Sequence, residues 1–317
     1  MTKREMISLL LTFLLLVLMA PAPIGCAESE VKLEHRLLDA LRQASDLNDE
    51  ALQELVLNQN DALIPLLTRQ LSNEDEDLRH AALFGILLIG GNPAKAVFEA
   101  ELKKADDVEE RAGIRGMLCA VLGSTRSRDD EQFLIESLQG PVQSDEGEVI
   151  GAAIEPAALT LGILRSHAAV PALQKCAVED TWSIAAHACN RTLQWIESPP
   201  PPVELPDSAG DPEKIIAAVI HAGVPRMEQS VVFQEADSSR KWIRVNNVWK
   251  EVPVVFTGKN TEAPTISFKL HISKDNMRAI VAVGLDFGPL NAKGYTYVLQ
   301  RSSQGWIVRQ IVSTWIS

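Results

Sequence analysis

The sequence contains none of the short motifs that usually mark an active site. It has no Gly-x-Ser-x-Gly elbow for a nucleophile, no glycine-rich phosphate loop with a Lys, and no His-Glu-x-x-His zinc motif. Its six histidines are scattered singly, and His187 and Cys189, two positions apart, would face different sides of a helix. We therefore expect no catalytic residue, no metal site and no cofactor, and a protein that is not an enzyme.

The chain also has little basic charge. It carries 30 Lys or Arg against 42 Asp or Glu, for a net charge of −12. Residues 1–213 hold 17 basic and 35 acidic residues, a net of −18, whereas residues 214–317 hold 13 and 7, a net of +6. Because nucleic-acid binding needs a basic surface, we expect no nucleic-acid partner. The opposite charges would let the two parts of the chain attract each other over about 8–10 Å at ordinary salt.

The N-terminal apolar run, residues 7–19, falls short of the roughly 20 residues that span a bilayer. It follows Lys3 and Arg4 and is followed by small residues. A basic N-terminal region, a short apolar core and a cleavage site with small residues are typical of an export signal, here residues 1–26. We expect an extracytoplasmic protein.

The end of this signal allows two interpretations. The letters PIGC at 23–26 resemble a bacterial lipobox, which implies that Cys26 becomes the lipid-bearing first residue, although Pro23 departs from the aliphatic residue of that motif. The alternative is ordinary cleavage after Ala27, with Gly25 as the second small residue. The first makes the protein a lipoprotein of the bacterial envelope, in contact with the membrane through its lipid anchor only. The second makes it periplasmic or secreted.

The chain has only four cysteines, and Cys119, Cys176 and Cys189 remain if Cys26 is lipidated or removed. Cys176 and Cys189 fall on consecutive predicted helices and could pair in an oxidising compartment. The alternative is that both are small buried side chains between packed helices. Cys119, within GMLCAVLG, is expected in the core.

Short helical segments repeat along the first part of the chain. Ala-Ala-Leu at 81–83 leads into Gly-Ile-Leu at 85–87, and Ala-Ala-Leu at 157–159 leads into Gly-Ile-Leu at 162–164. Four first helices, about 34–40 residues apart, are predicted near 60–72, 94–105, 128–139 and 168–178. Such a period indicates a solenoid, and helices this short gain their stability by stacking on their neighbours.

The alternation of an Ala-rich helix, a short turn and a helix with VPAL resembles the HEAT-like repeats of phycobilisome-lyase-type proteins. The resemblance covers about residues 60–197, with 31–58 as a capping helix pair. It implies an α-solenoid over 27–198 and almost nothing about chemistry, because its motif residues are packing residues. The stretch 139–156 is longer than a standard turn, so we expect one distorted repeat there.

A proline-rich linker, 199–212, separates this solenoid from a second domain, 213–317, so the chain is predicted to be multidomain. One helix is predicted at 211–223. The apolar period then changes to two, as in ISFKLHI at 266–272, and a hairpin loop is predicted at 302–305. We expect a small α+β domain with an antiparallel sheet.

The last 50 or so residues, with Tyr295, Tyr297, Gly305 and Trp306, resemble the terminal hairpin of nuclear-transport-factor-like and cystatin-like folds. That resemblance implies a cavity between a helix and a curved sheet. His271, Asp286, Tyr295 and Tyr297 could line it, and Trp306 could mark an exposed binding surface. The alternative is that the aromatic residues pack in the sheet and that Asp286 belongs to a turn.

The function expected from the sequence is that of an exported, non-enzymatic binding or scaffolding protein. It would engage a protein or peptide partner through the helical repeats, the C-terminal sheet, or both. The alternative is a small-molecule-binding or enzymatic α+β domain carried on a helical platform. Acidic clusters at 73–77 and 105–110 are expected to be solvated helix caps, with a calcium site or a patch for a basic partner as the alternatives. The sequence indicates no particular oligomeric state.

Overall fold

The computed structural model describes most of the chain beyond the expected export signal. The described residues are 30–44, 50–139, 142–143, 149–150, 152–179, 184–198, 205, 209–222, 232–235, 241–245, 248–252, 265–286 and 292–316. The chain divides into two compact units, 1–39 and 40–317, and the second contains almost all of the described structure. The signal segment, Cys26 and most of the proline-rich linker lie outside the described residues. None of the described helices has the length and apolar character needed to span a bilayer.

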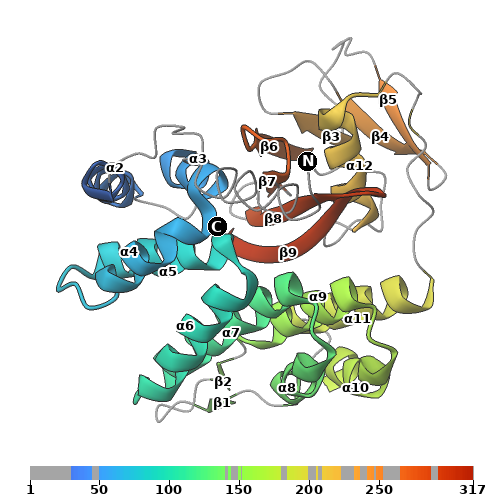
Figure 1. Cartoon of the computed structure of the whole chain (residues 1–317). Helices are drawn as coiled ribbons and strands as arrows, with labels where there is room; N and C mark the ends of the chain where they lie inside the picture. The colour runs from blue at the N-terminus through green and yellow to red at the C-terminus, as the bar shows by residue number, and fades with distance from the viewer. Residues whose placement is uncertain are drawn as a thin grey trace, which may run out of the picture. The chain divides into compact units, whose positions relative to one another are not determined.

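The first part of the chain is helical, as predicted. Its helices are α2 (Glu30–Gln43), α3 (Glu50–Gln59), α4 (Ile64–Gln70), α5 (Glu76–Ile89), α6 (Gly91–Lys104), α7 (Val108–Thr125), α8 (Glu131–Ser137), α9 (Ile154–Leu164), α10 (Val170–Glu179) and α11 (Ile184–Glu197). The four predicted first helices correspond to α4, α6, α8 and α10 (Figure 1). The long stretch between α8 and α9 contains two short antiparallel strands, β1 (Val142–Gln143) and β2 (Val149–Ile150).

The helix that follows each of the predicted first helices is called a second helix, and two of these, α5 and α7, begin in the same way. Their N-terminal caps are 32 residues apart. Asp75 caps the N-terminus of α5, and Asp107 caps that of α7, each accepting hydrogen bonds from backbone amides of the first turn. Four residues after each cap, Arg79 and Arg111 donate to backbone carbonyls of the preceding turn. The same pairing of an Asp cap and an Arg thus holds the turn before each of the two helices.

The second part is α+β, also as predicted. It consists of α12 (Asp211–His221) and the strands β3 (Val232–Glu235), β4 (Lys241–Val245), β5 (Val248–Val252), β6 (Thr265–Ile272), β7 (Arg278–Asp286), β8 (Ala292–Ser302) and β9 (Gly305–Ile316). In the described residues these strands form one sheet, in the order β5-β4-β3-β6-β7-β8-β9. The predicted antiparallel pairing holds from β6 to β9 and for β3–β4–β5, whereas β3 lies parallel to β6. The predicted hairpin joins β8 to β9 through Ser303 and Gln304.

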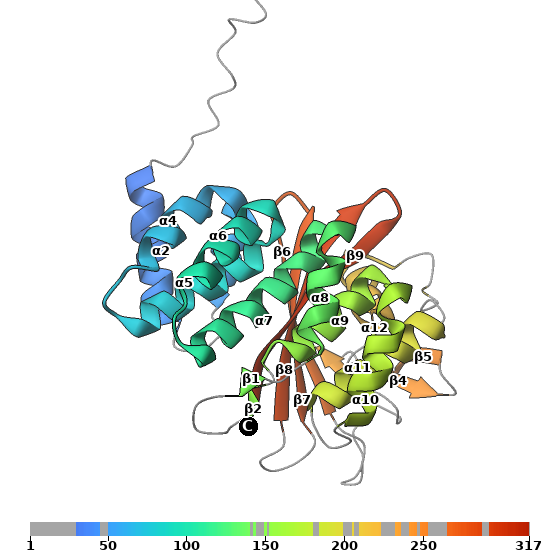
Figure 2. The same cartoon turned by 90° about the horizontal axis from the view of Figure 1, so that it is seen from below.

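Helices cover both faces of this sheet. On the first face, side chains such as Val281, Tyr297 and Leu299 pack against apolar residues of α12 and against Leu159 of α9 in one continuous core. On the second face Ile280 is buried, and α3 approaches β6 and β7. Figure 2 looks past α7 and α9 onto the strands behind them. The helical part and the sheet therefore share their core within residues 40–317.

The C-terminal end of α5 is completed by side chains of the sheet. A helix leaves its last four carbonyls without intrahelical partners. In α5 the Gly90 amide donates to the first of these carbonyls, and Gln310 of β9 donates to the Leu87 carbonyl at 2.9 Å. Arg278 of β7 donates to the last two, the carbonyls of Leu88 at 3.3 Å and Ile89 at 3.0 Å. The cation also lies at the negative end of the helix dipole.

Helix α7 covers the free edge of β9, the last strand in the sheet order. Arg126 donates to the Val308 carbonyl at 3.2 Å. A Cβ atom on Gly123 would lie 2.7 Å from the Arg309 carbonyl oxygen, so only glycine permits this approach of helix to strand. Covering an edge strand in this way removes a template for pairing with other chains.

Replacing Arg278 by Met should lower the free energy of unfolding by about 2–3 kcal/mol, because two buried carbonyls lose a charged donor. Urea unfolding followed by circular dichroism measures the change. Arg301→Met is the control, because Arg301 makes an exposed ion pair with Asp211 and such pairs contribute about 0–1 kcal/mol. Equal losses in the two variants would contradict the role given to Arg278.

Candidate functional site

The structure places the predicted pocket residues on different faces of the sheet. His271 of β6 lies opposite Ile280 and belongs to the second face, whereas Tyr295 and Trp306 belong to the first face. Asp286 is the last residue of β7, and its side chain lies outside the described residues. The prediction of one pocket lined by these residues is therefore wrong for His271, because side chains alternate between the faces of a strand.

Trp306 is a packed residue rather than an exposed one. Only 7% of its surface is accessible, and its indole Nε1 lies 3.4 Å from a carboxylate oxygen of Asp211, in the first turn of α12. Asp211 also pairs with Arg301 at 3.1 Å, and the Arg301 guanidinium lies 5.9 Å from the centre of the Trp306 ring. These contacts attach the start of α12 to the β8–β9 hairpin.

His271 lies on the second face, close to charged residues of α3. Burial lowers its pKa below 6.5, Lys269 on the same strand lowers it further, and Glu54 of α3 opposes both effects. Lys269 forms an ion pair with Glu50, also of α3. His271 Nε2 is buried and has no hydrogen-bond partner in the described part of the chain. The neutral imidazole is thus the form that this contact between α3 and the sheet accommodates.

Acidification should therefore destabilise the protein through His271. A depressed pKa means that the unfolded chain binds a proton more tightly than the folded one, so the contribution of neutral His271 is complete above pH 6.5 and declines as the pH falls. Unfolding free energies measured between pH 7 and pH 5 should decrease less in His271→Gln than in the wild type. His187→Gln changes an exposed histidine and should keep the wild-type slope. An unchanged slope in His271→Gln would contradict this role.

A buried polar cluster lies where α9 and α11 meet β8. We call Glu155 of α9, Arg191 and Trp195 of α11, and Tyr295 and Tyr297 of β8 the junction cluster. The Tyr295 hydroxyl donates to Glu155 Oε1 at 2.9 Å. Both tyrosines are almost completely buried, with 2% and 0% of their surfaces accessible. Tyr295 thus joins β8 to a charged group of α9.

The electrostatics of the junction cluster follow from burial. Burial raises the pKa of Tyr297 to about 12, although the nearby Arg191 lowers it. Burial and the neighbouring carboxylate of Glu155 raise the pKa of Tyr295 as well. Burial lowers the pKa of Arg191, and the two tyrosines and Glu155 oppose that effect. At neutral pH the tyrosines are therefore neutral hydroxyls, and Arg191 keeps its charge.

Arg191 and Trp195 carry hydrogen-bond donors that meet no acceptor in the described residues. The donors are Nη1 and Nη2 of Arg191 and Nε1 of Trp195, and all three atoms are buried. Room for the Trp195 ring is made by Gly162 of α9, where a Cβ atom would lie 2.8 Å from a ring carbon. Neither residue was predicted from the sequence, although an Arg and a Trp one turn apart in an Ala-rich helix are a visible signal.

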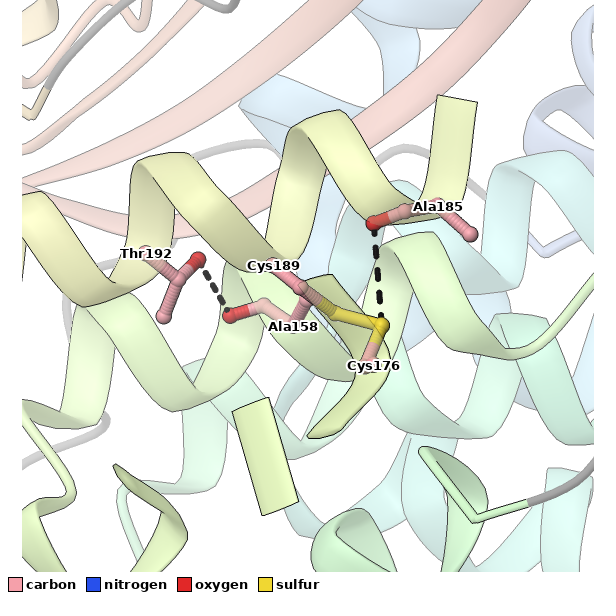
Figure 3. Close-up of a disulfide and its surroundings, with 5 residues drawn as sticks. All are labelled: Ala158, Cys176, Ala185, Cys189 and Thr192. Carbon is pink, nitrogen blue, oxygen red and sulfur yellow. Dashed lines mark hydrogen bonds between the residues drawn. A yellow bond between two sulfur atoms is a disulfide. The ribbon is translucent and has the colours of Figure 1, made fainter. Parts of the chain in front are cut away.

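Helix α11 is fixed in place by a disulfide and by a side-chain hydrogen bond (Figure 3). Cys176 of α10 and Cys189 of α11 form a disulfide, which is the first of the two alternatives that the sequence left open for them. Thr192 donates to the Ala158 carbonyl of α9 at 2.9 Å. The sulfur of Cys176 lies 3.8 Å from the Ala185 carbonyl oxygen. This is a van der Waals contact and not a hydrogen bond, because a disulfide sulfur carries no hydrogen. A disulfide closing a loop of this size contributes about 3 kcal/mol.

The remaining described cysteine, Cys119, is fully buried in α7, as expected. Burial raises the pKa of its thiol to about 11, so it is a packing residue rather than a nucleophile. In the described residues no group of three or more His, Cys, Asp or Glu is placed to hold a metal ion.

No protein-family model, curated protein or solved structure matches the chain.

Proposed function

We propose that the chain is an exported, non-enzymatic binding or scaffolding protein of the bacterial envelope. In this proposal a HEAT-like helical-repeat region presents the binding surface, and the C-terminal α+β part is attached to it as a support. The partner is a protein or peptide and not a nucleic acid.

The contacts between successive second helices support the helical-repeat proposal. Thr160 of α9 donates to the Cys119 carbonyl of α7 at 2.8 Å, and Thr192 of α11 donates to the Ala158 carbonyl of α9 at 2.9 Å. The two threonines are 32 residues apart, which is also the spacing of the Asp caps on α5 and α7. A serial stack built from one repeated contact is what a solenoid requires.

The disulfide supports export. Disulfides persist in oxidising compartments and are rare in the cytosol, where thiols are kept reduced. Cys176 and Cys189 are joined, and the chain begins with the features of an export signal. The proposal places the protein in the periplasm or on the envelope through a lipid on Cys26, with secretion as the alternative.

The mass of the mature chain, extracted from envelopes without reductant, tests this assignment. A lipoprotein should begin at Cys26 and carry the added mass of the lipid, whereas ordinary cleavage gives an unmodified chain that begins at Glu28. In either case the mass should rise by that of two hydrogens on reduction, because one disulfide opens. A chain that keeps residues 1–26, or has no disulfide, would contradict export.

One observation indicates the chemistry of the partner. The turns that lead into α5 and α7 carry exposed carboxylates, which we call the acidic rim. The described members of the rim are Glu74, Asp75, Glu76, Asp77, Asp106, Asp107, Glu109 and Glu110. In contrast, the exposed large apolar side chains among the described residues are Val31, Val178 and Met277, which do not form a rim of their own. A basic protein segment is therefore the partner that this surface favours.

Charge reversal at the acidic rim tests this proposal. The variant Glu74→Lys/Glu109→Lys/Glu110→Lys leaves both Asp caps intact, and Asp129→Lys/Glu136→Lys/Glu197→Lys makes the same change in net charge at other exposed positions. Calorimetry with decalysine should give binding that weakens with salt and is at least about tenfold weaker in the rim variant only. Equal losses in both variants would show that net charge, and not the rim, attracts the peptide.

A further inference from the structure

The junction cluster presents three buried donors and no acceptor for them. Nη1 and Nη2 of Arg191 and Nε1 of Trp195 are covered from solvent, and no described residue accepts a hydrogen bond from them. Buried polar groups in folded proteins are almost always paired, so each exception calls for a physical explanation. A charged guanidinium makes the exception larger, because arginine does not lose its proton in proteins.

The three donors belong to two side chains on α11. Arg191 and Trp195 are four positions apart on α11, so their side chains lie one above the other on the same side of the helix. The disulfide at Cys189 and the hydrogen bond from Thr192 hold this stretch of α11 against α10 and α9. The donors therefore have a fixed position, which lowers the entropy lost when an acceptor binds.

We propose that Arg191 and Trp195 bind the carboxylate group of a small organic acid. The planar guanidinium offers two parallel N–H groups that match the two oxygens of a carboxylate, and the indole N–H supplies a third donor. The fixed carboxylate of Glu155 lies close enough to influence Arg191, and its negative charge disfavours a dianion such as phosphate.

The surroundings of these donors suit an acid with an apolar body. Trp195 and Ile163 pack against the core of the first face, which includes Leu159, Tyr295 and Tyr297. Arg191 and Glu155 each keep part of their residue surface in solvent, although the Nη atoms of Arg191 are covered. Both the helical part and the sheet contribute residues, and the site would be incomplete in either part alone. This inference does not depend on the proposed protein partner or on the acidic rim.

Calorimetry on the intact mature protein tests the inference with acetate and benzoate, and with benzamide and inorganic phosphate as comparison compounds. We expect saturable binding of the carboxylates, tighter for benzoate than for acetate, and none for neutral benzamide. Arg191→Lys keeps the charge but loses the planar fork, and should weaken benzoate binding at least about tenfold. Arg165→Lys, an exposed arginine at the end of α9, should bind as the wild type does.

A second measurement remains decisive if Arg191→Lys fails to fold. Trp195→Phe removes the indole donor. In a ¹H–¹⁵N correlation spectrum it also assigns the Trp195 indole signal, because one of the six tryptophan indole signals disappears. Benzoate should shift that signal in the wild type, and benzamide should not. Absence of saturable carboxylate binding, preference for phosphate, or a Trp195 signal that does not respond to benzoate would each overturn the inference.

Discussion

The structure of residues 40–317 depends on the way the sheet completes the end of α5. Three of the last four carbonyls of that helix receive their hydrogen bonds from Arg278 and Gln310, which lie more than 180 residues further along the chain. Neither part satisfies these groups alone, and a buried carbonyl without a donor is costly. The helices and the sheet therefore form one compact unit, rather than two domains that only touch.

This constraint also decides which surfaces are available to a partner. One side of α7 and of α9 packs against β9, and Leu159 of α9 joins the core of the first face. The turns that lead into α5 and α7 keep their carboxylates in solvent. The uneven charge of the chain thus has two consequences. Basic residues of the sheet form ion pairs with acidic residues of the helices, as Lys269 does with Glu50. The carboxylates of the acidic rim remain exposed.

The sequence predicted what depends on local pattern. Helices α4, α6, α8 and α10 were located because their apolar residues recur at helical spacing, and the β8–β9 hairpin because two strands flank a short loop. The sequence could not predict what depends on register between distant strands. His271 and Tyr295 both alternate with apolar neighbours, and only the pairing of β6, β7 and β8 assigns them to opposite faces. The contact of Arg278 with α5 had no local signal at all.

In the junction cluster, the contribution of Arg191 to stability can be weighed against a role in binding. A buried arginine beside a carboxylate is rarely the most stable choice, because apolar residues of similar size often pack as well without the cost of desolvating a charge. Here Tyr295 already uses one oxygen of Glu155, while the Nη atoms of Arg191 find no acceptor among the described residues. Packing therefore does not account for Arg191, whereas the carboxylate binding that we propose would give its donors an acceptor.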